Sequence, residues 1–86
     1  MPVLSAFLGI LIKMFHDDHS PPHFHVEYGE FNALVEIGSG KVLAGKLPKR
    51  AGQLVTEWRR LHVDELRRAW TEAQNGRQPR RIRPLE

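Results

Sequence analysis

The chain has 86 residues, of which 41% are hydrophobic and 27% are charged, and it contains no cysteine. Its length allows one small core, its apolar content excludes a disordered chain, and the lack of cysteine excludes disulfides and thiolate zinc sites. The formal net charge is +3, but residues 1–40 carry one base and five acids, whereas residues 41–86 carry twelve bases and five acids. This asymmetry predicts an acidic partner, either nucleic acid or protein.

The first predicted element is a central strand over residues 6–15, AFLGILIKMF, because both of its faces are apolar. The apolar run 3–12 is shorter than the roughly 20 residues that span a bilayer. No basic residue precedes it and no small-residue cleavage pattern follows it. We therefore expect no membrane segment and a cytoplasmic location, with which the lack of cysteine is compatible.

Residues 23–28 and 31–37 form the next two predicted strands, joined by Gly29 and Glu30. Glycine at the first central position is typical of a type II′ hairpin turn, because that position needs a positive φ. The turn then places three pairs on one apolar face of the hairpin: Tyr28 with Phe31, Val26 with Ala33, and Phe24 with Val35.

A second hairpin is predicted through Ser39 and Gly40. It leads into a fourth strand over residues 41–44 and places Ile37 opposite Val42. In that register the apolar face of the sheet continues into the fourth strand.

After Pro48 the hydrophobic period becomes that of an amphipathic helix, which ends before Gly76. A break is expected near residues 62–64. Trp58 falls on the apolar stripe and is predicted to be buried, whereas Trp70 falls beside it and is predicted to be partly exposed. The residues of the stripe recur at threes and fours: Ala51, Leu54, Val55, Trp58, Leu61, Leu66, Ala69 and Ala73.

These elements predict an α+β fold, with a mainly antiparallel four-stranded sheet and one long or broken C-terminal helix packed on one face. We expect a single domain over residues 1–76 and a basic tail over residues 77–86. Ile82 and Leu85 are candidate anchors for this tail.

The stretch FHDDHSPPHFHVEY, residues 15–28, holds four of the five histidines. In the predicted register His23 and His25 share the face opposite the apolar one, and Glu36 lies across from His23. Residues at i and i+2 on a strand are about 6 to 7 Å apart, which allows two imidazoles to bind one ion.

A third ligand can come from His19 or His16 in the preceding loop, and Glu27 or Glu36 can ligate or orient an imidazole. The candidate metal set is His19, His23, His25 and Glu36. Nitrogen and oxygen ligands without sulfur suit zinc, nickel, copper, iron or manganese, with zinc as the default.

Two other interpretations of this stretch remain open. The side chains can perform acid/base catalysis without a metal, since imidazole titrates near neutral pH, with His19, His23, His25 and Glu27 as candidates. Alternatively, they form an ordinary polar strand face.

The basic half offers a second candidate surface. Arg59, Arg60, Arg67 and Arg68 lie off the apolar stripe, but interspersed acids favour a solvated helix face. The tail is the better candidate for binding nucleic acid or a partner, through Arg77, Arg80, Arg81 and Arg83.

Four segments occur in the order MFHDDHSPPHFHVEYGEF, GKLPKRA, EWRRLHVDELRRAW and IRPL. In this order the chain resembles the small bacterial proteins of the domain of unknown function 4160 family. The resemblance carries over His19, Pro21, Pro22, His23, His25, Glu27 and Tyr28 as the candidate site. The chain departs from the usual pattern at Asp17, where a small residue is typical, so the loop shape is less defined.

The resemblance implies a component of a toxin-antitoxin-type gene pair, beside a small protein of the domain of unknown function 2442 family. We therefore expect a regulatory or interaction protein that acts by binding a partner, and homo-oligomers are compatible with this role. The alternative is a metal- or histidine-dependent hydrolase, acting for example on RNA, with its site on the histidine-rich strand.

Overall fold

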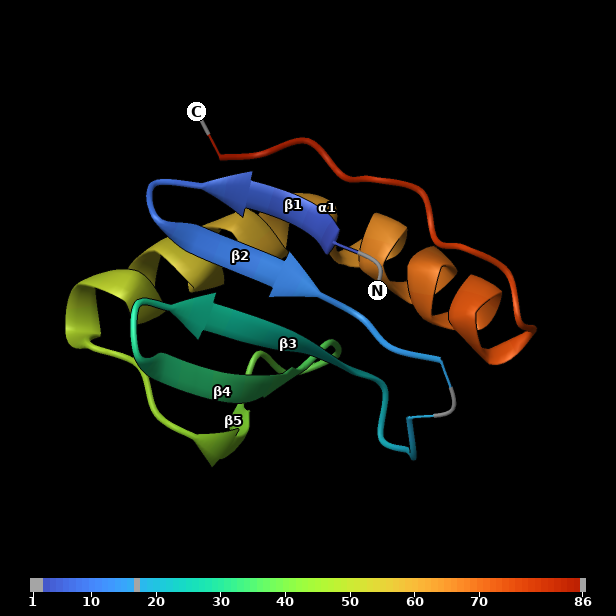
Figure 1. Cartoon of the computed structure of the whole chain (residues 1–86), viewed down its shortest axis with the longest axis horizontal. Coiled ribbons are helices and arrows are strands. Elements are labelled where there is room, and N and C mark those ends of the chain that lie inside the picture. The colour runs from blue at the N-terminus through green and yellow to red at the C-terminus, as the bar shows by residue number, and fades with distance from the viewer. Residues whose placement is uncertain (1–2, 17, 86) are drawn as a thin grey trace.

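The computed structural model describes residues 3–16 and 18–85. It contains one antiparallel sheet whose five strands lie side by side in chain order, and a long helix that covers one face of this sheet (Figure 1). The predicted α+β class is confirmed, with one strand more than expected. The elements are β1 (Val3–Phe7), β2 (Ile10–Lys13), β3 (His23–Tyr28), β4 (Phe31–Glu36), β5 (Val42–Gly45) and α1 (Lys49–Gln74).

The extra strand arises because the predicted strand 6–15 is a hairpin. The chain turns at Leu8 and Gly9, which have φ angles of 49° and 83°, and β1 then pairs with β2 through Phe7 and Ile10. Positive φ at both central residues is the signature of a type I′ turn. Leu8 is exposed at this turn. Because leucine seldom adopts a positive φ, the apolar run around it predicted a continuous strand and not a turn.

The predicted register of β3 and β4 is confirmed over all six pairs, from His23 opposite Glu36 to Tyr28 opposite Phe31. Gly29 has a φ of 58°, while Glu30 is not at positive φ. This pattern of signs matches the predicted type II′ turn. Phe24 and Val26 are therefore fully buried against the helix. His25 lies on the other face, and His23, at the start of β3, also contacts Trp70 near the end of α1.

The predicted register of the last strand is wrong, because Val42 lies opposite Val35 and not opposite Ile37. The Ile37 N–H donates instead to the carbonyl of Pro22. Ile37 is thereby bonded to the loop that precedes β3. All four residues of β5 are exposed, so this strand does not extend the apolar face.

Helix α1 contains the predicted break, since His62 has non-helical angles of φ −127° and ψ 23°. Leu61 was predicted to lie on the apolar stripe but is 66% exposed. The His62 ring takes that place and lies 5.5 Å from the ring of Trp58. Trp70 is buried, contrary to the prediction, because it packs against His23 at a ring separation of 5.3 Å. Within the described ranges, α1 is too polar to cross a membrane, and no other helix of that length occurs.

Trp58 lies at the centre of the core and is fully buried, as predicted. Its ring contacts Phe7 of β1 at 5.6 Å and Phe24 of β3 at 5.8 Å between centroids. Its Nε1–H donates to the carbonyl of Arg83 at 2.8 Å. One side chain therefore joins the sheet, the helix and the C-terminal segment.

The C-terminal segment, residues 77–85, runs back along the outer edge of β1 (Figure 1). The Ile82 N–H donates to the carbonyl of Leu4 at 2.7 Å. As predicted, Ile82 is buried in the core and Leu85 packs against it. The segment is therefore held by backbone and apolar contacts, and its arginines project from a fixed backbone.

We expect Trp58→Ala to lower the free energy of unfolding by about 3–5 kcal/mol, because it opens a large cavity and removes a buried hydrogen bond. Urea unfolding followed by circular dichroism measures this loss. The matched control is Leu61→Ala, whose exposed side chain is expected to change stability by no more than about 0.5 kcal/mol. Equal losses for the two variants would contradict this account of the core.

Replacing Ile82 by alanine tests whether the C-terminal segment belongs to the fold. We expect Ile82→Ala to cost about 2–5 kcal/mol in the same unfolding experiment, as for other buried aliphatic side chains. Arg81→Ala, one position away and exposed, is expected to leave the urea midpoint unchanged. A midpoint for Ile82→Ala equal to that of the parent would show that the segment contributes nothing to the core.

Candidate metal centre

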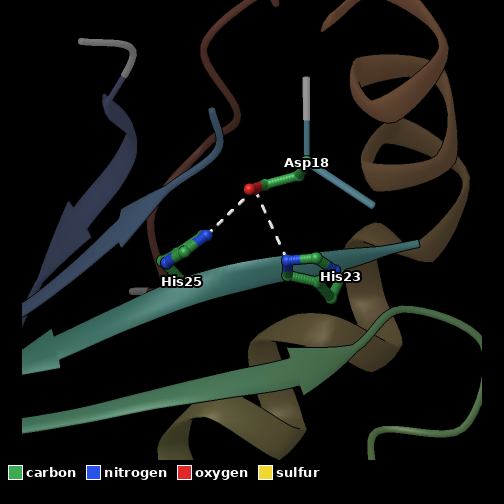
Figure 2. A group of neighbouring side chains, drawn as sticks. All are labelled: Asp18, His23 and His25. Carbon is green, nitrogen blue, oxygen red and sulfur yellow. Dashed lines mark hydrogen bonds and ion pairs between the residues drawn. The ribbon is translucent and has the colours of Figure 1, made fainter. Parts of the chain in front are cut away.

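Three side chains from β3 and the loop before it converge at one point (Figure 2). The Oδ2 atom of Asp18 lies 3.0 Å from Nε2 of His25 and 3.4 Å from Nε2 of His23. Within the part of the chain that the structure describes, they form the one group of three or more histidines and acids able to offer ligand atoms within 4.8 Å of each other.

The local structure explains why these side chains meet. Successive side chains of a strand point to opposite faces, so His23 and His25 share a face while Phe24 between them enters the core. The loop that follows β2 then returns Asp18 over the start of β3. The Gln74 Nε2–H holds this loop by donating to the backbone carbonyl of Asp18 at 3.0 Å.

The tautomer of His23 follows from its hydrogen bonds. Its Nδ1 atom lies 2.8 Å from the carbonyl oxygen of Pro21, which can only accept a hydrogen bond. Nδ1 must therefore carry a proton. In neutral His23 the lone pair is then on Nε2, which is the atom that faces Asp18.

This arrangement directs the Nε2 lone pair of neutral His23 and the Asp18 carboxylate toward the same point, 3.4 Å apart. A metal ion bound between them would meet electron pairs from both groups. The same carboxylate oxygen also contacts His25. The three side chains therefore form a candidate ligand group for one metal ion.

The distances suit a small tetrahedral ion. Two ligands at about 2.0–2.1 Å from a tetrahedral zinc lie about 3.3–3.4 Å apart. The observed separations of 3.4 Å for His23 and 3.0 Å for His25 are close to this value. All three ligand atoms lie within 4.8 Å of one another, so rotation of the side chains could bring them around one zinc ion.

The site is enclosed on one side and open on the other. His23 is only 7% exposed, and Trp70 packs against it. Phe15 places its ring edge-on to His25 at 4.5 Å between centroids. Asp18 and His25 keep about a quarter of their side chains exposed, so a ligand can approach from solvent.

A shallow pocket of about 220 Å³ is lined by His25, though not by Asp18 or His23. Phe15 and Leu34 supply apolar walls, and Glu27 and Asn32 supply polar groups. The pocket also reaches the end of β5. It offers room for a small molecule or one unit of a polymer beside the group.

The structure brings together only part of the predicted site. Among the described residues, neither His19 nor Glu36 belongs to the group of three, and their role as ligands stays a prediction. His19 is exposed in the loop, while Glu36 accepts a hydrogen bond from the Ser39 hydroxyl. Glu27 forms an ion pair with Lys13 at 2.9 Å.

The candidate set omitted Asp18, although its carboxylate lies between the two histidines in space. An acidic residue a few positions before a His-x-His strand could have indicated a third ligand. The direction of its side chain, however, depends on the conformation of the loop. That loop contains a cis peptide bond between Ser20 and Pro21. Asp17, where the sequence departs from the expected loop pattern, lies outside the described residues.

The arginines divide into two groups. Arg59 donates to the carbonyls of Ile37 and Gly38, each at 2.8 Å, so it fixes the turn between β4 and β5. The other candidates project into solvent, and their role in binding nucleic acid or a partner stays a prediction: Arg60, Arg67, Arg68, Arg77, Arg80, Arg81 and Arg83.

No curated protein and no solved structure matches the chain. A protein family matches it over residues 9–71, and its description is Domain of unknown function (DUF4160). The match includes Asp18, His23 and His25, whereas β1 and the C-terminal segment lie outside it. Because the match covers most of the 86 residues, the chain belongs to this family of proteins with a domain of unknown function, DUF4160.

Proposed function

We propose that this protein binds one transition-metal ion, with zinc as the first choice, through Asp18, His23 and His25, and that it uses this ion in a hydrolytic reaction. The convergence of three ligand atoms within 4.8 Å of one another carries the proposal. The ligands differ from the predicted set by the exchange of His19 and Glu36 for Asp18.

The number and exposure of the ligands favour catalysis over a purely structural ion. Structural zinc sites use four protein ligands, whereas catalytic sites use three and leave a position for water or substrate. Here three ligands face a side that is open to solvent, and the pocket beside His25 provides space for a substrate. A metal ion at this point would supply a Lewis acid beside that pocket.

The hydrogen bond made by the other ring nitrogen of His23 supports the same proposal. Metal-bound histidines commonly donate their other ring N–H to a carbonyl or carboxylate, which fixes the tautomer. His23 has this arrangement through its Nδ1–H and the Pro21 carbonyl. A histidine on an ordinary solvated strand face needs no such hydrogen bond, and its side chain would be more exposed than that of His23.

A regulatory role in a toxin-antitoxin-type pair, acting by partner binding, is the second candidate. A different observation favours it. Strand β5 exposes all four of its residues, including Val42 and Leu43, at one edge of the sheet, and exposed apolar side chains can mark a surface that binds another protein.

We expect isothermal titration calorimetry to show one zinc ion bound per chain at neutral pH, for protein prepared without a histidine tag. Asp18→Asn, His23→Ala and His25→Ala are each expected to weaken binding strongly, by about 10-fold or more, because each removes a ligand or its charge. Affinity is expected to fall on acidification, because protons and the metal compete for the same imidazole nitrogens.

The exposed His16→Ala and His19→Ala variants are matched controls from the same loop. Unchanged affinity in both would support the three-ligand set, whereas a loss with His19→Ala would restore His19 as a ligand. Equal zinc binding by the parent and by the His23→Ala/His25→Ala double variant would exclude the site.

The hydrolytic proposal predicts metal-dependent cleavage of a labelled single-stranded RNA. Cleavage is expected to stop after chelation and in Asp18→Asn, and to return when zinc is restored to the parent alone. Gel electrophoresis of the labelled strand measures this. Zinc binding without any cleavage would separate the two parts of the proposal and favour the partner-binding role.

A further inference from the structure

The C-terminal segment, residues 77–85, is a basic element with a fixed position. It contains four arginines and no acidic residue. It follows the outer edge of β1 (Figure 1), where the Ile82 N–H donates to the Leu4 carbonyl at 2.7 Å. The next carbonyl, that of Arg83, accepts a hydrogen bond from the Trp58 indole at 2.8 Å. The backbone that carries the arginines is therefore held by the core of the domain.

Burial along this segment recurs at every third residue. Pro79 and Ile82 are buried, and Leu85 packs against the core. A period of three residues is that of a polyproline II helix. Pro79 and Pro84 favour this backbone conformation for themselves and for the residue before each of them. The apolar side chains at this period therefore face the core, and the residues between them face outward.

Three arginines occupy these outward positions, and we call Arg80, Arg81 and Arg83 the arginine row. All three are exposed. Arg80 and Arg83 are three positions apart and share one side of such a helix, about 9 Å apart along its axis, while Arg81 projects from another side. Among the described residues, none of the three forms an ion pair with an acid. Glu72 instead accepts a hydrogen bond from the backbone N–H of Arg80 at 3.4 Å.

We propose that the arginine row binds the phosphodiester backbone of nucleic acid, independently of base sequence. A guanidinium group is always charged and can donate two parallel hydrogen bonds to one phosphate. The fixed backbone presents three such groups with little further loss of conformational entropy on binding. The row shares no residue with the metal centre, so this binding goes beyond the function proposed above and requires neither a metal ion nor hydrolysis.

The surroundings of the row favour nucleic acid over an acidic protein. Protein interfaces have an apolar and aromatic centre that supplies most of their affinity. Here the apolar side chains of Pro79, Ile82 and Leu85 face the core, and Pro84 is the exposed apolar residue of the segment. Contacts with phosphate need charge and hydrogen-bond donors and no apolar centre. The row offers what phosphate contacts need and lacks the centre of a protein interface.

Fluorescence anisotropy of short labelled oligonucleotides tests the proposal with the full chain, in the presence of a chelator that prevents any metal-dependent cleavage. Single-stranded RNA, single-stranded DNA and duplex DNA form separate arms of the experiment. We expect all three to bind, because they share the phosphodiester backbone, and we expect little dependence on base sequence. Affinity is expected to fall steeply as salt is added, because binding releases counterions from the phosphates.

The variant Arg80→Gln/Arg81→Gln/Arg83→Gln removes the charges of the row and keeps the backbone hydrogen bonds of the segment. Each phosphate contact contributes about 0.7 on single strands to the slope of log affinity against log salt. We therefore expect the slope to fall by about 2 and the affinity at about 0.1 M salt to fall about 100-fold. Because the three side chains are exposed, the urea midpoint is expected to equal that of the parent.

Two control variants separate the row from net charge and from the metal centre. Lys41→Gln/Lys46→Gln/Lys49→Gln removes the same charge from exposed side chains around β5 and is expected to keep the slope of the parent. His23→Ala/His25→Ala is expected to bind the oligonucleotides as the parent does. Failure of the metal proposal would therefore leave this one intact.

Three results would overturn the proposal. One is the absence of an anisotropy change with every oligonucleotide at low salt. Another is an equal loss of affinity in the arginine and lysine variants, which would show attraction by net charge alone. The third is competition by polyglutamate as strong as that by unlabelled nucleic acid of equal charge, which would assign the row to an acidic protein.

Discussion

The contact between Phe24 and Trp58 decides where the histidines of this protein point. Phe24 is fully buried and meets the indole edge-on at a centroid distance of 5.8 Å. Because side chains alternate along β3, burying Phe24 against the helix directs both His23 and His25 to the opposite face. The same indole fixes the C-terminal segment through the Arg83 carbonyl. A core contact therefore sets the geometry of the candidate site and closes one edge of the sheet.

The predictions from sequence were right where the conformation depends on neighbouring residues. They were wrong or incomplete where it depends on residues distant in the chain. The β3–β4 register follows from the glycine in the turn and the alternation of apolar residues, and both are local. The reversal at Leu8 was missed because apolar residues on both faces conceal a turn. Asp18 was missed because its position depends on the loop, which Gln74 of the helix holds from 56 positions away. The helix break was expected, but its effect on Leu61 required knowledge of the His62 conformation.

The charge at Asp18 links the stability of the domain to its proposed chemistry. One carboxylate oxygen contacts two imidazoles, and the Pro21 carbonyl fixes the proton of His23 on the far nitrogen. A metal ion bound at this point would contact all three side chains. A domain of 86 residues has a small core and a small stability. Any ion that binds the folded chain and not the unfolded one would therefore add directly to the free energy of unfolding.

The metal centre and the β5 edge are separate surfaces, but they border the same pocket. His25 lines one side of it, and Ala44 and Gly45 of β5 line another. Position 45 favours glycine, because an added Cβ would lie 2.1 Å from the Asn32 carbonyl oxygen and the φ of this residue is 75°. The wall of the pocket at this point is therefore backbone packed directly against backbone. The enzymatic and the partner-binding interpretations are compatible in one molecule, since a partner at β5 would lie beside the pocket wall formed by Ala44 and Gly45 and not beside the wall formed by His25.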